Sequence, residues 1–295
     1  MKLKELLFVA LVMPTPFGWA QSPESIQKTP GGLVTRLGQA RVELSAVNTN
    51  TFRLAVTVNG VPEISSSTFL VDTTNALFSG WREVSRRGMV GVETAAGQLL
   101  INPRDGRWTL EDAGGRTLIP RHLLGSFTAS DSGSVELDLG WKAYKPLCVY
   151  GCGNGTNTLE QSQAKTRVGN GVAVIPYFWS SSGYSVLAVT ADDNHPARWR
   201  AGPDGQSVTW TFPGAAADLY LMPSATLKDA AKNYARLTGY APVPPRWAFG
   251  YLQSRWGWVN REYIGQTLDK FQQLRLPVDA FIFDFEWYTP TPDYT

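Results

Sequence analysis

The stretch "WAFGYLQSRWGWVNREYIGQTLDKFQQLRLPVDAFIFDFEW", residues 247–287, decides the fold of the carboxyl-terminal part of the chain. Its first six residues form a continuous apolar run that predicts a strand, and the following QSRWGWVN predicts a loop. Asn260 can cap a helix over REYIGQTLDKFQQL, and Pro277 prevents its continuation. VDAFIFDF predicts a second apolar strand. One helix between two such strands is typical of a βαβ unit with buried, parallel strands.

Residues 30–222 have a different pattern. Short alternating runs such as ARVELSAV and SVTWTFPG are separated by Gly, Asn and Asp, which predicts an antiparallel β-sandwich. A helix is expected from Thr226, which with Asp229 resembles a capping box, to Gly239. Leu227, Ala230, Ala231 and Tyr234 would share one face of that helix. The Pro-rich segment YAPVPPRW then marks a boundary, so we predict a sandwich domain at 21–240 and the beginning of an α/β domain at 241–295.

The amino terminus predicts export. Lys2 and Lys4 precede an apolar run, and small residues lead to Ala20, which is the pattern of a secretory signal over residues 1–20. A buried helix is the alternative, but Pro14 and Pro16 disfavour it. Since no other segment has the roughly 18 apolar residues that a membrane span needs, we expect a secreted or periplasmic protein without a membrane span.

Composition excludes some partners. The chain of 295 residues carries 27 basic and 25 acidic side chains, and no basic stripe stands out, so nucleic acid is a poor candidate. His122 and His195 have no cluster of ligand residues near them in the sequence. We therefore predict no bound metal and no catalytic triad that uses histidine.

Two cysteines, Cys148 and Cys152, lie in the segment LCVYGCGNG, which begins a Gly-rich turn. An even count in an exported chain favours a disulfide. Zinc is less favoured, because no histidine lies near and a closed zinc site needs four ligands. Two buried free thiols are the third alternative.

Two acids, Asp284 and Glu286, stand two residues apart at the end of the second predicted strand, so they share one face. At the carboxyl end of a parallel barrel strand such carboxylates can bind sugar hydroxyls, hold a metal or transfer protons. Acids on a solvated loop, or an acid that caps a following helix, are the alternatives. The spacing alone favours these alternatives.

The loop after the first predicted strand carries Gln253, Arg255, Trp256 and Trp258, and parallel strands would bring it to the same edge as Asp284. Flat indole rings with polar neighbours suit the carbon face of a sugar. Packing of the tryptophans between the two domains is the alternative. For the whole cluster the two interpretations are equally supported.

These motifs together resemble glycoside hydrolase family 31, the α-glucosidase and α-xylosidase family. The matching positions are Pro244, Pro245, Trp247, Ala248, Gly250, Tyr251, Gln253, Ser254, Arg255, Trp256, Gly257, Pro277, Asp279, Asp284, Glu286 and Trp287. The turn YGCGNG and the segment GVAVIPYFWSSSGYSVLAVT are also similar to the family. The resemblance covers roughly residues 30–295 and is most specific in the last fifty.

The resemblance implies a galactose-mutarotase-like β-sandwich followed by the start of a (β/α)8 TIM barrel. It implies retaining cleavage of α-linked oligosaccharides or polysaccharides, without a cofactor, by two carboxyl groups on later strands beyond residue 295. Asp284 matches the position that binds hydroxyls of the sugar in the −1 subsite, whereas Glu286 stands where many members have Asp. The implied substrate-binding residues are Asp284, Glu286, Trp287, Arg255, Trp256 and, from the Gly-rich loop, Asn154 and Asn157.

The leading functional prediction is an exported α-glycosidase, most simply an α-glucosidase. An α-glucosyltransferase uses the same covalent intermediate, and an α-xylosidase differs only in the pocket, so both stay open. A non-catalytic carbohydrate-binding fragment is the alternative of another class, because the first elements of a barrel cannot close it.

Overall fold

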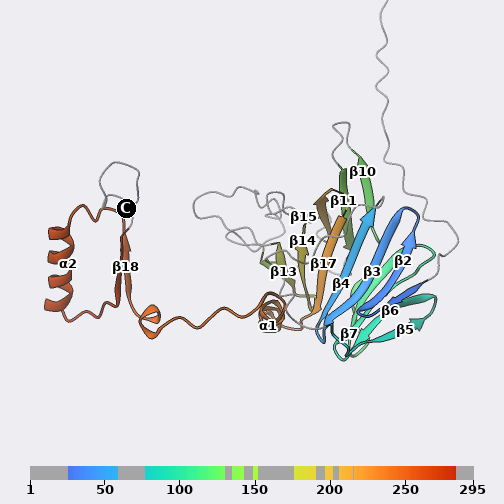
Figure 1. Cartoon of the computed structure of the whole chain (residues 1–295), viewed down its shortest axis with the longest axis horizontal. Helices are drawn as coiled ribbons and strands as arrows, with labels where there is room; N and C mark the ends of the chain where they lie inside the picture. The colour runs from blue at the N-terminus through green and yellow to red at the C-terminus, as the bar shows by residue number, and fades with distance from the viewer. Residues whose placement is uncertain are drawn as a thin grey trace, which may run out of the picture. The chain divides into compact units, whose positions relative to one another are not determined.

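The computed structural model describes residues 26–58, 77–129, 135–142, 149–151, 176–190, 197–201, 206–214 and 216–283. The chain divides into two compact units, Met1–Gly239 and Tyr240–Thr295. Figure 1 shows strands packed in layers in the first unit, and α2 beside β18 in the second.

Three sheets form the described part of the first unit. The largest has the order β1 (Gln27–Thr29), β2 (Gly32–Leu37), β3 (Ala40–Asn48), β4 (Thr51–Val58), β17 (Ala216–Pro223), β14 (Tyr184–Val189), β13 (Tyr177–Ser180) and β12 (Val149–Gly151). The second has the order β10 (Ser126–Ala129), β11 (Val135–Lys142), β16 (Ser207–Pro213) and β15 (Arg198–Ala201). The third runs β5 (Arg82–Arg86), β6 (Met89–Thr94), β7 (Gly97–Ile101), β8 (Arg107–Asp112) and β9 (Thr117–Leu123). Neighbouring strands pair antiparallel in all three sheets, so the predicted sandwich is confirmed.

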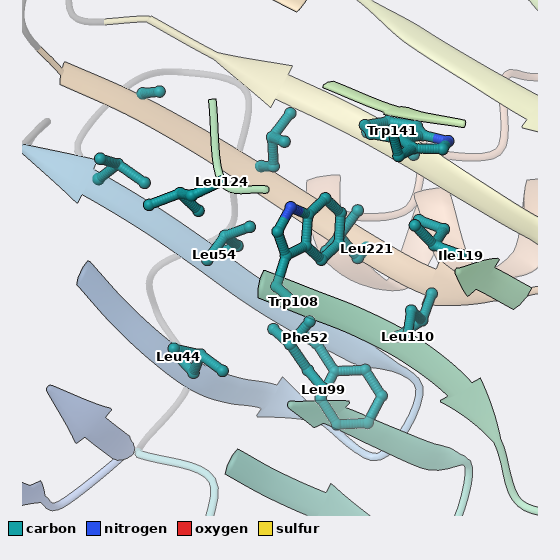
Figure 2. Packing of buried hydrophobic residues seen from close by; sticks show 14 of the residues in the cluster. Leu44, Phe52, Leu54, Leu99, Trp108, Leu110, Ile119, Leu124, Trp141 and Leu221 are labelled. Atoms are coloured by element: carbon teal, nitrogen blue, oxygen red, sulfur yellow. The ribbon is translucent and has the colours of Figure 1, made fainter. Parts of the chain in front are cut away.

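One hydrophobic core lies between the large sheet and the other two. Figure 2 shows Phe52 and Leu54 of the large sheet close to Trp108 of the third sheet. Trp141 packs edge-on against Trp108, with ring centroids 5.8 Å apart. Because β-strand side chains alternate between faces, the core side chains of β4, β14 and β17 come from every second residue, as the sequence pattern predicts.

The helix α1 (Leu227–Thr238) covers part of the outer face of the large sheet through Leu237 and the half-buried Tyr234. Its predicted capping box is confirmed, because the Thr226 and Asp229 side chains each accept from the other's backbone N–H. Gly239 ends the helix with φ of 90°.

Burial on α1 only partly follows the predicted apolar face. Leu227 is 53% exposed, whereas Leu237 and the polar Asn233 are buried. Asn233 turns inward because its amide donates to the Pro223 carbonyl and the Ser224 hydroxyl, 3.1 Å away in each case. An asparagine whose side-chain amide has hydrogen-bond partners can therefore occupy the buried face of a helix, where hydrophobic periodicity would predict a leucine.

The second unit contains the predicted βαβ unit. β18 (Leu252–Arg255) and β19 (Ala280–Phe283) pair in parallel, and α2 (Arg261–Gln273) connects them. The Asn260 side chain accepts from the Tyr263 N–H at 2.8 Å, so the predicted cap is confirmed. The antiparallel sandwich and this βαβ unit agree with the predicted fold class, although the described residues do not close a barrel.

The position of the first strand is a correction. Residues predicted as the strand WAFGYL instead form a 3-10 helix, Arg246–Phe249, and β18 begins only at Leu252. Gly250 lies against the carboxylate of Asp279, which accepts from the Tyr251 N–H at 3.0 Å. The Tyr251 carbonyl in turn accepts from the Asp279 N–H at 2.9 Å. This contact between the two motifs sets where strand pairing starts, and a short apolar run cannot reveal it.

Replacing Gly250 with alanine should lower the free energy of unfolding of the second unit by about 1–3 kcal/mol, because the new Cβ would overlap the Asp279 carboxylate. Hydrogen exchange of the β18 and β19 amides measures this change. Gly265→Ala, on α2 with open space around the new Cβ, is the matched control and should leave protection equal or higher. Equal protection in both variants would contradict the proposed close fit.

None of the helices in the described ranges is long and apolar enough to cross a membrane. The predicted signal, residues 1–20, lies outside these ranges.

Candidate functional site

The ends of β18 and β19 reach the same edge of the second unit. Their parallel register runs from Leu252 opposite Ala280 to Arg255 opposite Phe283. The next residues along the chain are Trp256 after β18 and residue 284 after β19. The predicted meeting of the loop QSRWGW with the end of the second strand at one edge is therefore confirmed up to Phe283.

The two faces of this small sheet differ. Phe281 contacts Phe271 of α2, with ring centroids 5.9 Å apart, so α2 covers the face that carries Phe281. Alternation places Gln253, Arg255 and Phe283 on that same face. Leu252, Ser254, Ala280 and Ile282 lie on the other face. On this face Ile282 is 47% exposed, and Leu252 and Ala280 are partly buried.

Trp258 is a structural residue of the edge. It is fully buried, and its indole N–H donates to the Ile282 carbonyl at 3.1 Å. Its ring packs edge-on against Phe281 and Phe283 at 5.3 and 6.3 Å. Packing within its own unit therefore explains Trp258.

Arg255 and Trp256 are the predicted substrate-binding residues that the structure describes. Arg255 donates from Nε to the Trp256 carbonyl at 3.0 Å and from Nη1 to the Tyr263 hydroxyl at 2.7 Å. The Trp256 side chain is 63% exposed. Tyr263 was not predicted as a site residue. Its only signal in the sequence is an aromatic residue in the first turn after the Asn260 cap.

The other predicted site residues lie outside the described residues. They are Asp284, Glu286, Trp287, Asn154, Asn157, Cys148 and Cys152. His195, for which no role was predicted, also lies outside them. Their roles, and the disulfide, stay predictions. His122 is half-buried on β9, and burial together with Arg107 lowers the pKa of its imidazole.

A pocket of about 440 Å³ lies in the first unit between strand turns and α1. Its lining includes Arg116, Lys232 and Arg236 but no aromatic ring. Its acid Asp112 is already paired with Arg116 at 3.0 Å. A sugar site usually offers an aromatic surface, so this pocket is a poorer candidate than the edge at Trp256.

The most perturbed carboxyl group among the described residues is Asp218 on β17. Burial raises its pKa from 3.8 to about 6, and attraction to Arg53 offsets part of that rise. A shifted pKa can mark a functional site. Here the Asp218 side chain is fully buried and receives a hydrogen bond from Arg53 Nε at 2.7 Å, so the group has a structural role.

Metal ligands do not gather in the described ranges, where no group of three or more His, Cys, Asp or Glu side chains could hold an ion.

Comparisons with known proteins find similarity to one family of enzymes. Residues 241–295 match the profile "Glycosyl hydrolases family 31 TIM-barrel domain". An α-xylosidase of Saccharolobus solfataricus is 29% identical over 152 residues, which cover 48% of this chain and 20% of that protein. Alpha-glucosidase 2 of Bacillus thermoamyloliquefaciens is 27% identical over 112 residues, which cover 38% of this chain and 14% of that protein.

Solved structures show the same fold. A GH31 α-xylosidase from a soil metagenome, complexed with xylose, superposes with a TM-score of 0.72 at 17% identity over 89% of this chain and 41% of that chain. A GH31 dextranase of Flavobacterium johnsoniae, as a mutant complexed with isomaltotriose, gives a TM-score of 0.72 at 17% identity over 91% of this chain and 34% of that chain. The chain thus spans less than half the length of these proteins. The profile match over residues 241–295, the relatives and the shared fold agree with the paired motifs at Gly250 and Asp279, and they show that the chain is similar to proteins of glycoside hydrolase family 31.

Proposed function

We propose that the chain is the amino-terminal part of an exported, retaining α-glycosidase whose sugar-binding edge lies at the ends of β18 and β19. The observation that carries the proposal is the parallel register that brings Arg255 and Phe283 to one edge, directly before Trp256 and Asp284 in the sequence. In barrels of parallel strands the carboxyl ends of the strands carry the active site.

Asp284 is the proposed ligand of the sugar hydroxyls. If the period of two in β19 extends by one residue, residue 284 falls on the face of Ser254 and Ile282, away from α2. That face is the inner one in a (β/α)8 barrel, because the helices surround the sheet. Glu286 and Trp287 are proposed to continue this binding edge, and Asn154 and Asn157 to approach it from the Gly-rich loop.

Trp256 is the proposed surface for the sugar ring. An exposed indole offers a flat apolar face, which suits the carbon face of a pyranose. The covalent chemistry requires a nucleophilic carboxylate and a second carboxyl about 5 Å away that protonates the leaving oxygen. We assign neither of these two groups to a residue of this chain.

α-Glucosides are the simplest substrates, and α-xylosides are the second candidate because relatives and a solved neighbour are named α-xylosidases. The full-length protein should hydrolyse p-nitrophenyl α-glucoside or α-xyloside, but not the β-linked counterparts. Proton NMR should detect the α-anomer of the sugar as the first product, since retention is expected. Cleavage of β-linked substrates, or the β-anomer as the first product, would contradict the proposal. Sugar binding without turnover would favour a carbohydrate-binding role instead, and transfer to added glucose would favour a transferase.

A further inference from the structure

The side chain of Arg255 contacts two aromatic rings and donates two hydrogen bonds. Its guanidinium carbon lies 5.6 Å from the ring centroids of both Trp258 and Tyr263, which are cation–π distances. Its Nε and Nη1 groups donate to the Trp256 carbonyl and the Tyr263 hydroxyl. Of these partners, Trp258 is fully buried and Tyr263 belongs to the first turn of α2. Arg255 is thus fixed by both the loop and the helix.

The residues before and after Trp256 both make hydrogen bonds that hold the loop. Before the turn, Arg255 binds the Trp256 carbonyl. After it, Trp258 donates to the Ile282 carbonyl of β19. Gly257 between them has φ of 87°, a left-handed conformation that most side chains disfavour. The backbone at Trp256 is therefore constrained while its side chain stays 63% exposed.

Arg255 also lies on the wrong face for a direct sugar ligand. It shares the α2-covered face with Phe281 and Phe283, whereas Ser254 and Ile282 lie on the opposite face. A guanidinium has a rigid fork of donors, and two of its N–H groups are already used within the loop and α2.

We propose that Arg255 is a positioning residue that acts with Tyr263 to fix the Trp256 ring for sugar binding, and that it does not contact the sugar itself. This inference rests on the proposed function for its effect on catalysis, but the fixation of the loop can be tested without activity. The planar guanidinium is essential to this role. A lysine would retain the positive charge but could not donate to both the Trp256 carbonyl oxygen and the Tyr263 hydroxyl oxygen.

The kinetic test uses the full-length protein and its preferred aryl α-glycoside. Arg255→Lys and Tyr263→Phe should each raise KM on the order of threefold to tenfold with kcat nearly unchanged, because a stacking surface binds ground state and transition state alike. Arg261→Lys is the matched control, since Arg261 begins α2 and takes no part in these contacts. It should behave as wild type.

A double-mutant cycle separates positioning from general weakening of the fold. In a Trp256→Ala background, Arg255→Lys should add little to KM, because the ring that it positions is gone. An additive increase would overturn the proposal, and so would a large loss of kcat with unchanged KM, which indicates a direct transition-state contact.

The second readout needs no turnover. The indole N–H resonance of Trp256, assigned from its loss in Trp256→Phe, should be a single sharp peak in wild type. It should broaden or split in Arg255→Lys and stay sharp in Arg261→Lys. If the wild-type protein neither binds nor cleaves α-glycosides, the proposed function fails while this spectrum still tests the positioning. A spectrum unchanged by Arg255→Lys overturns the positioning.

Discussion

Arg53→Met is expected to lower the free energy of unfolding of the β-sandwich unit by about 3–5 kcal/mol. The reason is the carboxylate of Asp218, which is buried on the outer face of the large sheet, 2.7 Å from Arg53 Nε. Its other oxygen, Oδ2, is buried and has no hydrogen-bond partner among the described residues. Removing Arg53 would leave a buried charge without compensation, which costs far more than the pair contributes.

The size of this loss should depend on pH. In the folded protein burial raises the pKa of Asp218 to about 6, above the ordinary 3.8. Between these two values the folded state binds a proton that the unfolded state has released, so this group's contribution to stability decreases as pH rises from about 4 to about 6. Without Arg53 the pKa rises further. The variant should therefore be destabilised less at pH 5, where neutral Asp218 dominates, than at pH 8.

Urea unfolding at pH 5 and pH 8 measures both effects. Arg82→Met is the matched control, because Arg82 also pairs across strands, with Glu93 at 2.6 Å, but its side chain is 76% exposed. An exposed pair contributes little, so this variant should unfold almost as wild type at both pH values. In Asp218→Asn, the unfolding free energy should depend less on pH between pH 4 and pH 6 than in wild type. Equal losses of unfolding free energy in Arg53→Met and Arg82→Met would contradict the claim that burial determines how much the Arg53–Asp218 pair affects stability.

Elements with a local signal could be predicted from the sequence. The capping box at Thr226, the Asn260 cap and the parallel strands around α2 are confirmed, because each depends on residues within one short segment. The beginning of β18 could not be predicted, since it depends on the contact of Gly250 with Asp279 across the unit. Six apolar residues alone fit either a strand or a short helix.

The candidate site also contains features that the sequence predicts and features that it does not. Sequence position alone puts Arg255 and Trp256 together at the edge where the second strand ends. It does not show that Arg255 turns toward α2, because that orientation comes from Trp258 and Tyr263, which follow three and eight residues later. The pair Arg53–Asp218 joins residues 165 positions apart, and no local pattern predicts it.

Asp284 carries the largest expected effect on activity. Hydrogen bonds to sugar hydroxyls that strengthen in the transition state contribute several kcal/mol. Asp284→Ala in the full-length protein should therefore lower kcat/KM on the order of 10²–10³-fold. Asp284→Asn, which keeps one acceptor oxygen, should be impaired less. Asp269→Ala, which removes an exposed acid of α2, is the matched control.

The most direct test of the sugar-binding edge is kcat/KM of Asp284→Ala on the α-glycoside that the wild-type protein hydrolyses best, with far-UV circular dichroism to verify folding. We predict a folded protein with a loss of at least about 10²-fold, beside an unchanged Asp269→Ala. A folded Asp284→Ala variant with wild-type kcat/KM would contradict a sugar site at the ends of β18 and β19.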